Sequence, residues 1–364
     1  MDKAIQPLFF SLLRYALFHR KEQIEMNLSG DEYSRLYALA CQQGVPALVL
    51  SGLTDYNVNM SKDKVLETIA LIQRIKQENR HLNSGVIGIH KLLEDSNVNY
   101  AIVKGQAVAS YYPVPSLRSP GDVDYYCNNE NFQNSLDVLK NKWGIKVDSQ
   151  DSDIHVHYVY NRVTFEGHFS LFNFYNAKKN NRWNEILMES GIITVNIEDC
   201  PIKTLSPTIH VLYIFLHLYS HLIKLGIGIR QFCDLAVMLH YNHHIIDYKF
   251  LSENIEYFGM KRAYKACGSI LVDYLGISTD ELGFKLAPRD RKYGKRILNV
   301  VFYRGNMGHY EGNRVRVEKN IKRTAKAIFI KATHFFKFFL LAPAYNSRWM
   351  LRQIKRMIVK FSKR

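Results

Sequence analysis

Acidic residues are missing from the end of this sequence. Between Lys319 and Arg364 there are 13 Lys and Arg residues and no Asp or Glu. The formal net charge of the whole chain is +16, so residues 1–318 carry a charge of only about +3. The basic character therefore belongs to a C-terminal tail and not to the body of the protein.

Paired cysteines are missing as well. The five cysteines stand singly, no C-x-x-C motif occurs, and the number is odd; they are Cys41, Cys127, Cys200, Cys233 and Cys267. This usage favours reduced, mostly buried thiols over disulfides or a cysteine-based zinc site. We therefore expect a cytoplasmic protein.

Long apolar runs are also absent. No stretch reaches the roughly 18 apolar residues of a membrane-spanning helix, so we expect none. The apolar N-terminal stretch is interrupted by Arg14 and lacks a small-residue cleavage site, so we expect no signal peptide. At 364 residues, 47% of them hydrophobic, the chain is suited to a globular protein of two or three subdomains.

Residues 99–127 carry the most informative pattern of the chain. The apolar run Tyr100 to Val103 predicts a buried strand, and Lys104-Gly105 ends it. A small-residue segment then predicts the start of a helix, and a Pro-rich loop leads to a second strand that begins at Val123. Glycine at the first turn allows the backbone to approach a phosphate closely.

Two aspartates, Asp122 and Asp124, enter this second strand. Because strand side chains alternate between faces, both carboxylates point the same way, roughly 6–7 Å apart. Carboxylate oxygens suit Mg²⁺, which usually keeps substrate phosphates in its shell. Two such ions about 4 Å apart stabilise an in-line phosphoryl displacement. An Asp-x-Asp pair by itself is more often a solvated turn, so the interpretation depends on the surrounding residues.

The whole string VKGQAVASYYP…LRSPGDVDYY resembles the uncharacterised nucleotidyltransferase family, a branch of the polymerase-beta-like nucleotidyltransferase superfamily. The residues that match the family's pattern are Lys104, Gly105, Tyr112, Pro113, Arg118, Gly121, Asp122 and Asp124. The wider superfamily usually has Gly or Ser after the first glycine, where this chain has Gln106. The resemblance implies that Asp122 and Asp124 are catalytic metal ligands. It also implies a nucleotide-binding set, which consists of Lys104, Gly105, Arg118, Ser119 and Gly121.

A β-hairpin is predicted further along, because two alternating runs, 154–160 and 163–172, flank a turn at Asn161-Arg162. Glu166 and His168 share one face of its second strand. The segment Phe165-Glu166-Gly167-His168 is similar to the family's apolar-Glu-x-His pattern. The resemblance implies that Glu166 completes the metal site and acts as general base, with His168 as a candidate substrate contact. Alternatively, Glu166 is a solvent-facing residue at the edge of the sheet.

The first strand of the same hairpin carries His155 and His157 on one face, with Asp153 in line. Imidazole nitrogens are common transition-metal ligands. No further ligand is recognisable at metal spacing, so this hypothesis ranks below the carboxylate site. Alternatively, these histidines line the nucleotide cleft.

Two apolar helices are predicted over 208–223 and 230–241. Their polar residues have a spacing similar to the family's H-x-x-x-H followed by Arg and Asp, and they are His217, His221, Arg230 and Asp234. One interpretation is contact with a substrate or a nucleotide base. The other is a buried polar network in which a histidine bonds to Asp and holds the two helices together. Both stay open.

The fold class that follows is α+β: a small mixed β-sheet core of the nucleotidyltransferase type with N- and C-terminal helical lobes. The expected regions are 1–96 for the first helical lobe, 97–205 for the core, 206–312 for the second helical lobe and 313–364 for a basic amphipathic tail. Further helices are expected over 5–18, 31–43, 63–95 and 132–143, with a short helix or turn over 47–53 and one or two helices over 249–274. Short strands are expected over 145–147 and 191–197. No element is predicted over 178–189, and 276–295 is predicted as loop with short helical pieces.

The function implied by the resemblance is Mg²⁺-dependent transfer of a nucleoside monophosphate from a nucleoside triphosphate (NTP) to an unidentified hydroxyl acceptor. One alternative is a catalytically silent scaffold with this fold at a membrane surface or on nucleic acid. The presence of Asp122, Asp124 and Glu166 argues against this scaffold, because three converging carboxylates are costly without a cation. Another alternative is a small-molecule phosphotransferase, which normally needs a Gly-rich phosphate loop that is absent around the site.

The tail itself is amphipathic. Residues 348–363 place apolar side chains such as Leu351 and Ile354 at three- and four-residue steps, and 342–344 separate this helix from an earlier apolar one. A basic amphipathic helix suits an anionic membrane surface. We therefore expect peripheral contact with the inner face of a membrane, or packing of the apolar face on the protein's own body. Nucleic acid is the less favoured partner.

Overall fold

The computed structural model describes residues 5–20, 28–56, 58–145, 154–189, 191–224, 226–305 and 335–362, without the side chains of 357–362. Parts of three predictions lie outside these residues: the strand over 145–147 beyond its first residue, the role of Asp153, and the tail before residue 335. Ile145 itself is not in a strand.

The described residues form a six-stranded mixed sheet in the order β3-β4-β2-β1-β6-β5. The strands are β1 (Ala101–Val103), β2 (Val123–Tyr126), β3 (His155–Tyr160), β4 (Val163–His168), β5 (Ile192–Ile197) and β6 (Cys200–Leu205). β2 pairs antiparallel with β1 and parallel with β4, and β1 pairs parallel with β6. The β3–β4 hairpin is confirmed, and its turn residues Asn161 and Arg162 have φ of 48° and 62°, as a tight hairpin turn requires.

The two faces of this sheet differ because side chains alternate along each strand. Val123, Tyr125 and Phe165 belong to an apolar cluster that also contains residues of α4 (Lys62–Glu94) and α6 (Asn129–Trp143). Asp124 and Glu166, one residue away on β2 and β4, line a cavity on the opposite side. One face is therefore core and the other is available for chemistry.

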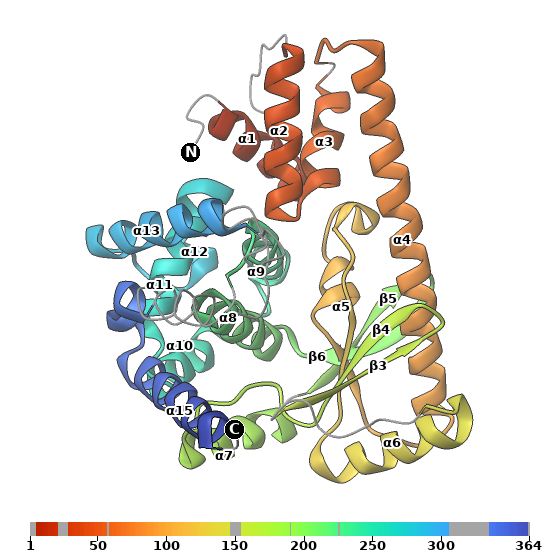
Figure 1. Cartoon of the computed structure of the whole chain (residues 1–364), viewed down its shortest axis with the longest axis vertical. Coiled ribbons are helices and arrows are strands. Elements are labelled where there is room, and N and C mark those ends of the chain that lie inside the picture. The colour runs from red at the N-terminus through yellow and green to blue at the C-terminus, as the bar shows by residue number, and fades with distance from the viewer. Residues whose placement is uncertain are drawn as a thin grey trace.

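The helices before the sheet are α1 (Ile5–Phe18), α2 (Gly30–Gln43), α3 (Pro46–Asp55) and the long α4, which runs from this group down along the sheet (Figure 1). Ser29 and Glu32 form a capping box at the start of α2, and Gly44 ends it with φ of 71°, both common helix-boundary devices. The sequence predicts α1, α2 and α4, and the segment expected as a short helix or turn is the helix α3.

The helices that follow the sheet in the chain pack against the group formed by α1 to α3. They are α8 (Pro207–Lys224), α9 (Ile229–Asn242), α10 (Tyr248–Tyr257), α11 (Lys261–Ile270), the short π-helix η2 (Leu271–Leu275), α12 (Thr279–Leu282) and α13 (Pro288–Arg304). Phe9 of α1 meets Phe302 of α13 with ring centroids 5.8 Å apart, and both lie in one apolar cluster. The two helical regions thus share a core, and the fold is the α+β arrangement that the sequence predicted.

Three elements differ from the sequence-based expectation. Residues 177–189 form α7 (Ala177–Glu189), which buries only Trp183, Ile186 and Leu187; these few apolar positions in a charged segment do not reveal a helix. Residues 191–205 form two strands, β5 and β6, joined at Glu198-Asp199. Residues from Pro288 onward form α13 rather than loop, because proline at the first helical position fits a helix.

The C-terminal segment docks on α8. It contains η4 (Phe339–Leu341) and α15 (Pro343–Ser362), so the second tail helix begins five residues before the predicted start at Arg348. Tyr345 and Trp349 are buried, and Asn346 hydrogen-bonds to the hydroxyl of Tyr219 on α8, 3.0 Å away. Body packing, one of the alternatives for the tail, therefore holds for the first part of α15.

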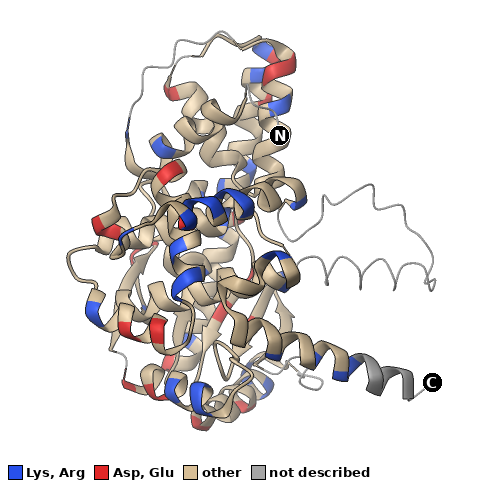
Figure 2. Cartoon of the chain, turned by 90° about the vertical axis from the view of Figure 1, so that its left-hand side faces the viewer, with Lys and Arg blue, Asp and Glu red and all other residues tan. Residues whose placement is uncertain are grey.

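The described part of α15 carries several Lys and Arg residues (Figure 2). Leu351 is 59% exposed and Ile354 is 41% exposed, among the basic residues Arg352, Lys355 and Arg356. Within the described part of the chain, no helix is long and apolar enough to cross a membrane.

Candidate functional site

Three carboxylates converge on the open face of the sheet. Asp124 of β2 is directly opposite Glu166 of β4 in the parallel register, and Asp122 lies just before β2. Each side chain offers an oxygen atom within 4.8 Å of the others. The predicted convergence of these three groups is thus present, while their role as metal ligands stays a prediction.

Lys104 lies against this cluster. Its Nζ is 2.6 Å from Oδ1 of Asp124. Burial, the largest single cause, opposes a charge on Lys104, but the combined negative charges around it, Asp124 first, outweigh burial and raise the pKa of the ammonium above its ordinary value. Lys104 has φ of 53° and Gly105, the first residue of α5 (Gly105–Ala109), has φ of 37°. A Cβ atom at Gly105 would lie 3.3 Å from the carbonyl oxygen of Asp122, so glycine permits this close turn.

His168 binds to two of the carboxylates. Its Nε2 is 2.8 Å from Oδ1 of Asp124 and 3.4 Å from Oε2 of Glu166. Burial opposes protonation of His168, but these hydrogen bonds raise its pKa. Burial alone would raise the pKa of Glu166, but the hydrogen bond from His168 and the charge of Lys104 lower it to about 2. Glu166 therefore stays ionised at neutral pH, as a metal ligand must.

Arg118 has a different environment from that expected of a phosphate ligand. It is 4% exposed, and its Nε and Nη2 donate to the two carboxylate oxygens of Asp234 at 2.8 and 3.0 Å. The hydroxyl of Tyr112 also donates to Asp234, at 2.7 Å. Asp234 is thus bonded to Arg118 and Tyr112, and not to the histidine of the proposed polar network. The network exists, but it ties the loop before β2 to α9.

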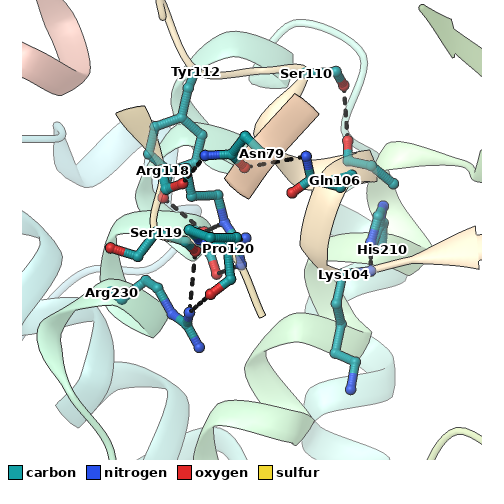
Figure 3. Close-up of polar contacts among 12 residues, drawn as sticks. Asn79, Lys104, Gln106, Ser110, Tyr112, Arg118, Ser119, Pro120, His210 and Arg230 are labelled. Atoms are coloured by element: carbon teal, nitrogen blue, oxygen red, sulfur yellow. Dashed lines mark hydrogen bonds and ion pairs between the residues drawn. The ribbon is translucent and has the colours of Figure 1, made fainter. Parts of the chain in front are cut away.

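Arg230 holds the same loop from the other side. Its Nη1 donates to the backbone carbonyls of Ser119 and Pro120 at 3.1 and 3.2 Å (Figure 3). Arg118 and Arg230 together fix the segment that leads from η1 (Pro115–Leu117) into Gly121 and Asp122. Their positions indicate that both arginines orient the loop that carries the first aspartate.

Gln106, which replaces the usual small residue, turns away from the carboxylates. It donates to Oδ1 of Asn79 on α4 at 3.3 Å (Figure 3). Asn79 in turn donates to the carbonyl oxygen of Arg118 at 2.8 Å. The departure from the superfamily's pattern thus links α5, α4 and the loop, and it leaves the Lys104-Gly105 turn intact.

A stripe of side chains on α8 runs along the site. The backbone N–H of Lys104 donates to Nε2 of His210 at 3.1 Å, near the start of this helix. The residues that follow at three- and four-residue steps and line the cavity are Tyr213, His217, His221 and Lys224. Burial, the largest cause, holds the pKa of His217 well below its ordinary value and lowers that of His221 to about 4. Both imidazoles are therefore neutral at physiological pH.

The cavity bounded by these groups has a volume of about 590 Å³. Near the carboxylates it is lined by Lys104, Gly105, Arg118, Gly121 and Arg230, together with Asp234. From Tyr213 to Lys224, α8 rises by roughly 1.5 Å per residue, or about 16 Å in all. The ring of Tyr175 lies 5.8 Å from Nζ of Lys224, and the cavity lining further includes Phe172, Asn173, Trp349, Gln353 and Arg356.

Trp349, Gln353 and Arg356 were not identified from the sequence as site residues. They lie on α15, more than a hundred residues from the carboxylates. The amphipathic pattern of the tail was visible, but nothing in it indicated contact with the cavity. Ser119 contributes a backbone carbonyl to the loop, and its role in nucleotide binding stays a prediction.

One comparison with known proteins identifies a family. A family model described as "Uncharacterised nucleotidyltransferase" matches residues 29–276, a range that includes every carboxylate above and excludes α15. No curated protein matches the chain. Among solved structures, the chain is similar to an antigenic nucleotidyltransferase-like protein from Paracoccidioides brasiliensis, with 18% identity and a TM-score of 0.34. That similarity covers 53% of this chain and 91% of the other.

Proposed function

The chain belongs to the uncharacterised nucleotidyltransferase family, and on this basis we propose that it transfers a nucleoside monophosphate from an NTP to a hydroxyl acceptor with the help of Mg²⁺. The observation that carries the proposal is the convergence of Asp122, Asp124 and Glu166 within 4.8 Å on one sheet face. Lys104 lies beside them, and its positive charge would neutralise part of the charge on the phosphates.

The donor set fits a divalent cation. Three carboxylates supply the hard oxygen ligands that Mg²⁺ prefers. One of them, Asp124, already interacts with a positive charge, the ammonium of Lys104. Asp122, Asp124 and Glu166 would hold the metal. When bound, the ion would neutralise charge on the reacting phosphate and lower the pKa of a coordinated hydroxyl.

The proposed reaction is an in-line displacement. The acceptor hydroxyl oxygen forms a bond to the α-phosphorus, the bond from that phosphorus to the bridging oxygen breaks, and pyrophosphate leaves. The hydroxyl proton passes to Glu166 or to water. Since the pKa of Glu166 is about 2, the base role is the weaker part of its assignment, and its ligand role is the stronger.

The nucleotide would occupy the end of the cavity at Lys104, Gly105 and Gly121, where the cationic residue and the close backbone turn lie. Arg118 would act there by positioning the loop, since its guanidinium is committed to Asp234. The acceptor would occupy the end lined by Tyr175, Lys224 and α15. The two basic side chains there, Lys224 and Arg356, favour an acceptor that carries a phosphate or carboxylate group.

A catalytically silent scaffold is the second candidate, and one observation favours it. Lys104 and His168 both contact Asp124, so they offset the repulsion among the carboxylates without any added cation. The cluster is therefore electrostatically tolerable in a protein that never binds metal. A phosphotransferase, the other alternative, would differ in its product, because it would add a phosphate to the acceptor and not a nucleoside monophosphate.

Asp122→Asn tests the proposal. We expect NTP with Mg²⁺ to raise the melting temperature of the wild type but not of the variant, because the variant loses one anionic ligand. Asp137→Asn, an exposed carboxylate on α6, is the matched control and should behave as wild type. Mass analysis of acceptor mixtures incubated with NTP then separates the classes. An added nucleoside monophosphate supports the proposal, whereas an added phosphate or no product at all contradicts it.

A further inference from the structure

Two histidines share the catalytic face of the sheet with Glu166. In the antiparallel β3–β4 register, His155 lies opposite His168 and His157 lies opposite Glu166. Glu166 and His168 are two residues apart on β4 and so point the same way. One nitrogen of His155, one nitrogen of His168 and one oxygen of Glu166 all lie within 4.8 Å of one another.

We propose that His155, Glu166 and His168 form a second metal position that takes a transition-metal ion such as Mn²⁺, Co²⁺ or Zn²⁺. It lies beside the Asp122–Asp124–Glu166 cluster and shares Glu166 with it. This goes beyond the proposed nucleotidyl transfer, because the metal site can exist whether or not the protein transfers nucleotides.

The ligand types decide which ions suit this position. Mg²⁺ demands oxygen ligands and binds imidazole poorly, whereas imidazole nitrogen suits first-row transition metals. Two imidazoles and one carboxylate leave room for further ligands, as in catalytic metal sites with an open position. The two neighbouring sets thus differ in chemistry: three carboxylates in one, and one carboxylate with two imidazoles in the other.

The spacing also suits a metal. Bonds of about 2.0–2.1 Å in a tetrahedral site place neighbouring ligand atoms roughly 3.3–3.5 Å apart. Nε2 of His168 and Oε2 of Glu166 are already 3.4 Å apart. The rings of His155 and His168 have centroids 5.0 Å apart. Glu166 has two oxygens, so the same carboxylate can bridge this position and the oxygen-only cluster.

The structure revises the hypothesis that paired His155 with His157. Nδ1 of His157 lies 3.5 Å from Oε1 of Glu166, and its side chain is 42% exposed. Among the described residues, His157 is not part of a three-ligand cluster. It therefore provides a matched control: the same residue type on the same strand face, outside the ligand set.

The test is a titration of full-length, chelator-treated protein with Co²⁺, followed by visible absorption and calorimetry. We expect one Co²⁺ ion to bind the wild type, His155→Gln to lose at least about 10-fold in affinity, and His157→Gln to lose less than about threefold. Equal affinity in the wild type and His155→Gln would overturn the proposal. So would loss of Co²⁺ in Asp122→Asn but not in His155→Gln, because the ion would then lie in the oxygen-only cluster.

A spectroscopic measurement on the wild type removes any dependence on folding of the variants. Pulsed electron paramagnetic resonance of the Mn²⁺-loaded protein should show coupling to imidazole nitrogen. Its absence contradicts the proposal. Product analysis separates this result from the proposed function, since nitrogen-coupled metal in a protein that transfers no nucleotide supports the site alone.

Discussion

The ammonium nitrogen of Lys104 lies 2.6 Å from Oδ1 of Asp124, inside the group of carboxylates that is the candidate metal site. Lys104 directly follows β1, and Asp124 belongs to β2, the antiparallel neighbour of β1. The positive charge of the lysine therefore stands next to the ligands that a divalent cation needs. It competes with the cation for Asp124, and it is available for phosphate when a cation binds.

Replacing this lysine separates the two roles. In Lys104→Met we expect Mg²⁺ alone to bind at least as tightly as in the wild type, because a competing charge is gone. NTP affinity should fall by roughly 10-fold, about the loss expected for one charge-assisted hydrogen bond. Isothermal titration calorimetry measures both. Lys203→Met, which removes a surface lysine paired with Glu94, is the control, and weaker Mg²⁺ binding with intact NTP binding in Lys104→Met would reject the idea.

The Arg118–Asp234 pair is predicted to act on stability. Asp234→Ala leaves a buried guanidinium without its partner and should lower the free energy of unfolding by about 3–5 kcal/mol. The double variant Arg118→Met/Asp234→Leu should recover much of that loss, because neither charge remains buried. Urea denaturation followed by circular dichroism measures the difference. If Arg118→Met keeps full stability and loses only NTP affinity, then Arg118 is a phosphate ligand after all.

The same pair predicts an acid-sensitive contribution. Burial alone would raise the pKa of Asp234, but Arg118 lowers it below the ordinary value. A carboxyl with a lowered pKa contributes its full stability above the unfolded-state pKa of about 3.9 and loses it as the pH falls further. We expect the stability of Asp234→Asn, compared with wild type by urea denaturation from pH 6 to pH 3, to fall less steeply below pH 4. Parallel curves would contradict this assignment.

Arg356 is predicted to bind the anionic group of a ligand in the cavity. Arg356→Gln should weaken binding of inorganic phosphate, a probe for the anionic group of the acceptor, by roughly two- to fivefold at low salt, as expected for one exposed charge pair. Lys355→Gln removes the neighbouring charge on the same helix outside the cavity lining and should have less effect. The fluorescence of Trp349, which lines the cavity, reports binding, with Trp349→Phe to identify its signal. Equal losses in the two variants would mean that only the general charge of α15 matters.

The exposed part of α15 is predicted to bind an anionic membrane surface. Full-length protein should co-sediment with phosphatidylglycerol vesicles at low salt, and Leu351→Ser/Ile354→Ser should reduce this, because apolar insertion and lysine attraction act together. Leu66→Ser/Ile69→Ser is a matched control, since these α4 residues are 65% and 45% exposed. The proposal fails if the wild type stays in the supernatant, or if both pairs of substitutions have the same effect.

The sequence by itself determined the local framework of the site. Strand, glycine turn, helix, loop and strand follow one another over residues 99–127, and alternation places Asp122 and Asp124 on one face. The same alternation places Glu166 with His168 on β4. These features depend on neighbours a few residues apart, and so the pattern of a short segment is enough to predict them.

Only the tertiary structure decided which groups meet. The parallel pairing of β2 with β4 brings Asp124 opposite Glu166, and α9 brings Asp234 to Arg118, with which it forms a buried ion pair. The docking of Tyr345 and Trp349 on the body places α15 at the cavity. Each of these contacts joins residues far apart in the chain, and each depends on sheet order and helix packing, which a local pattern does not encode.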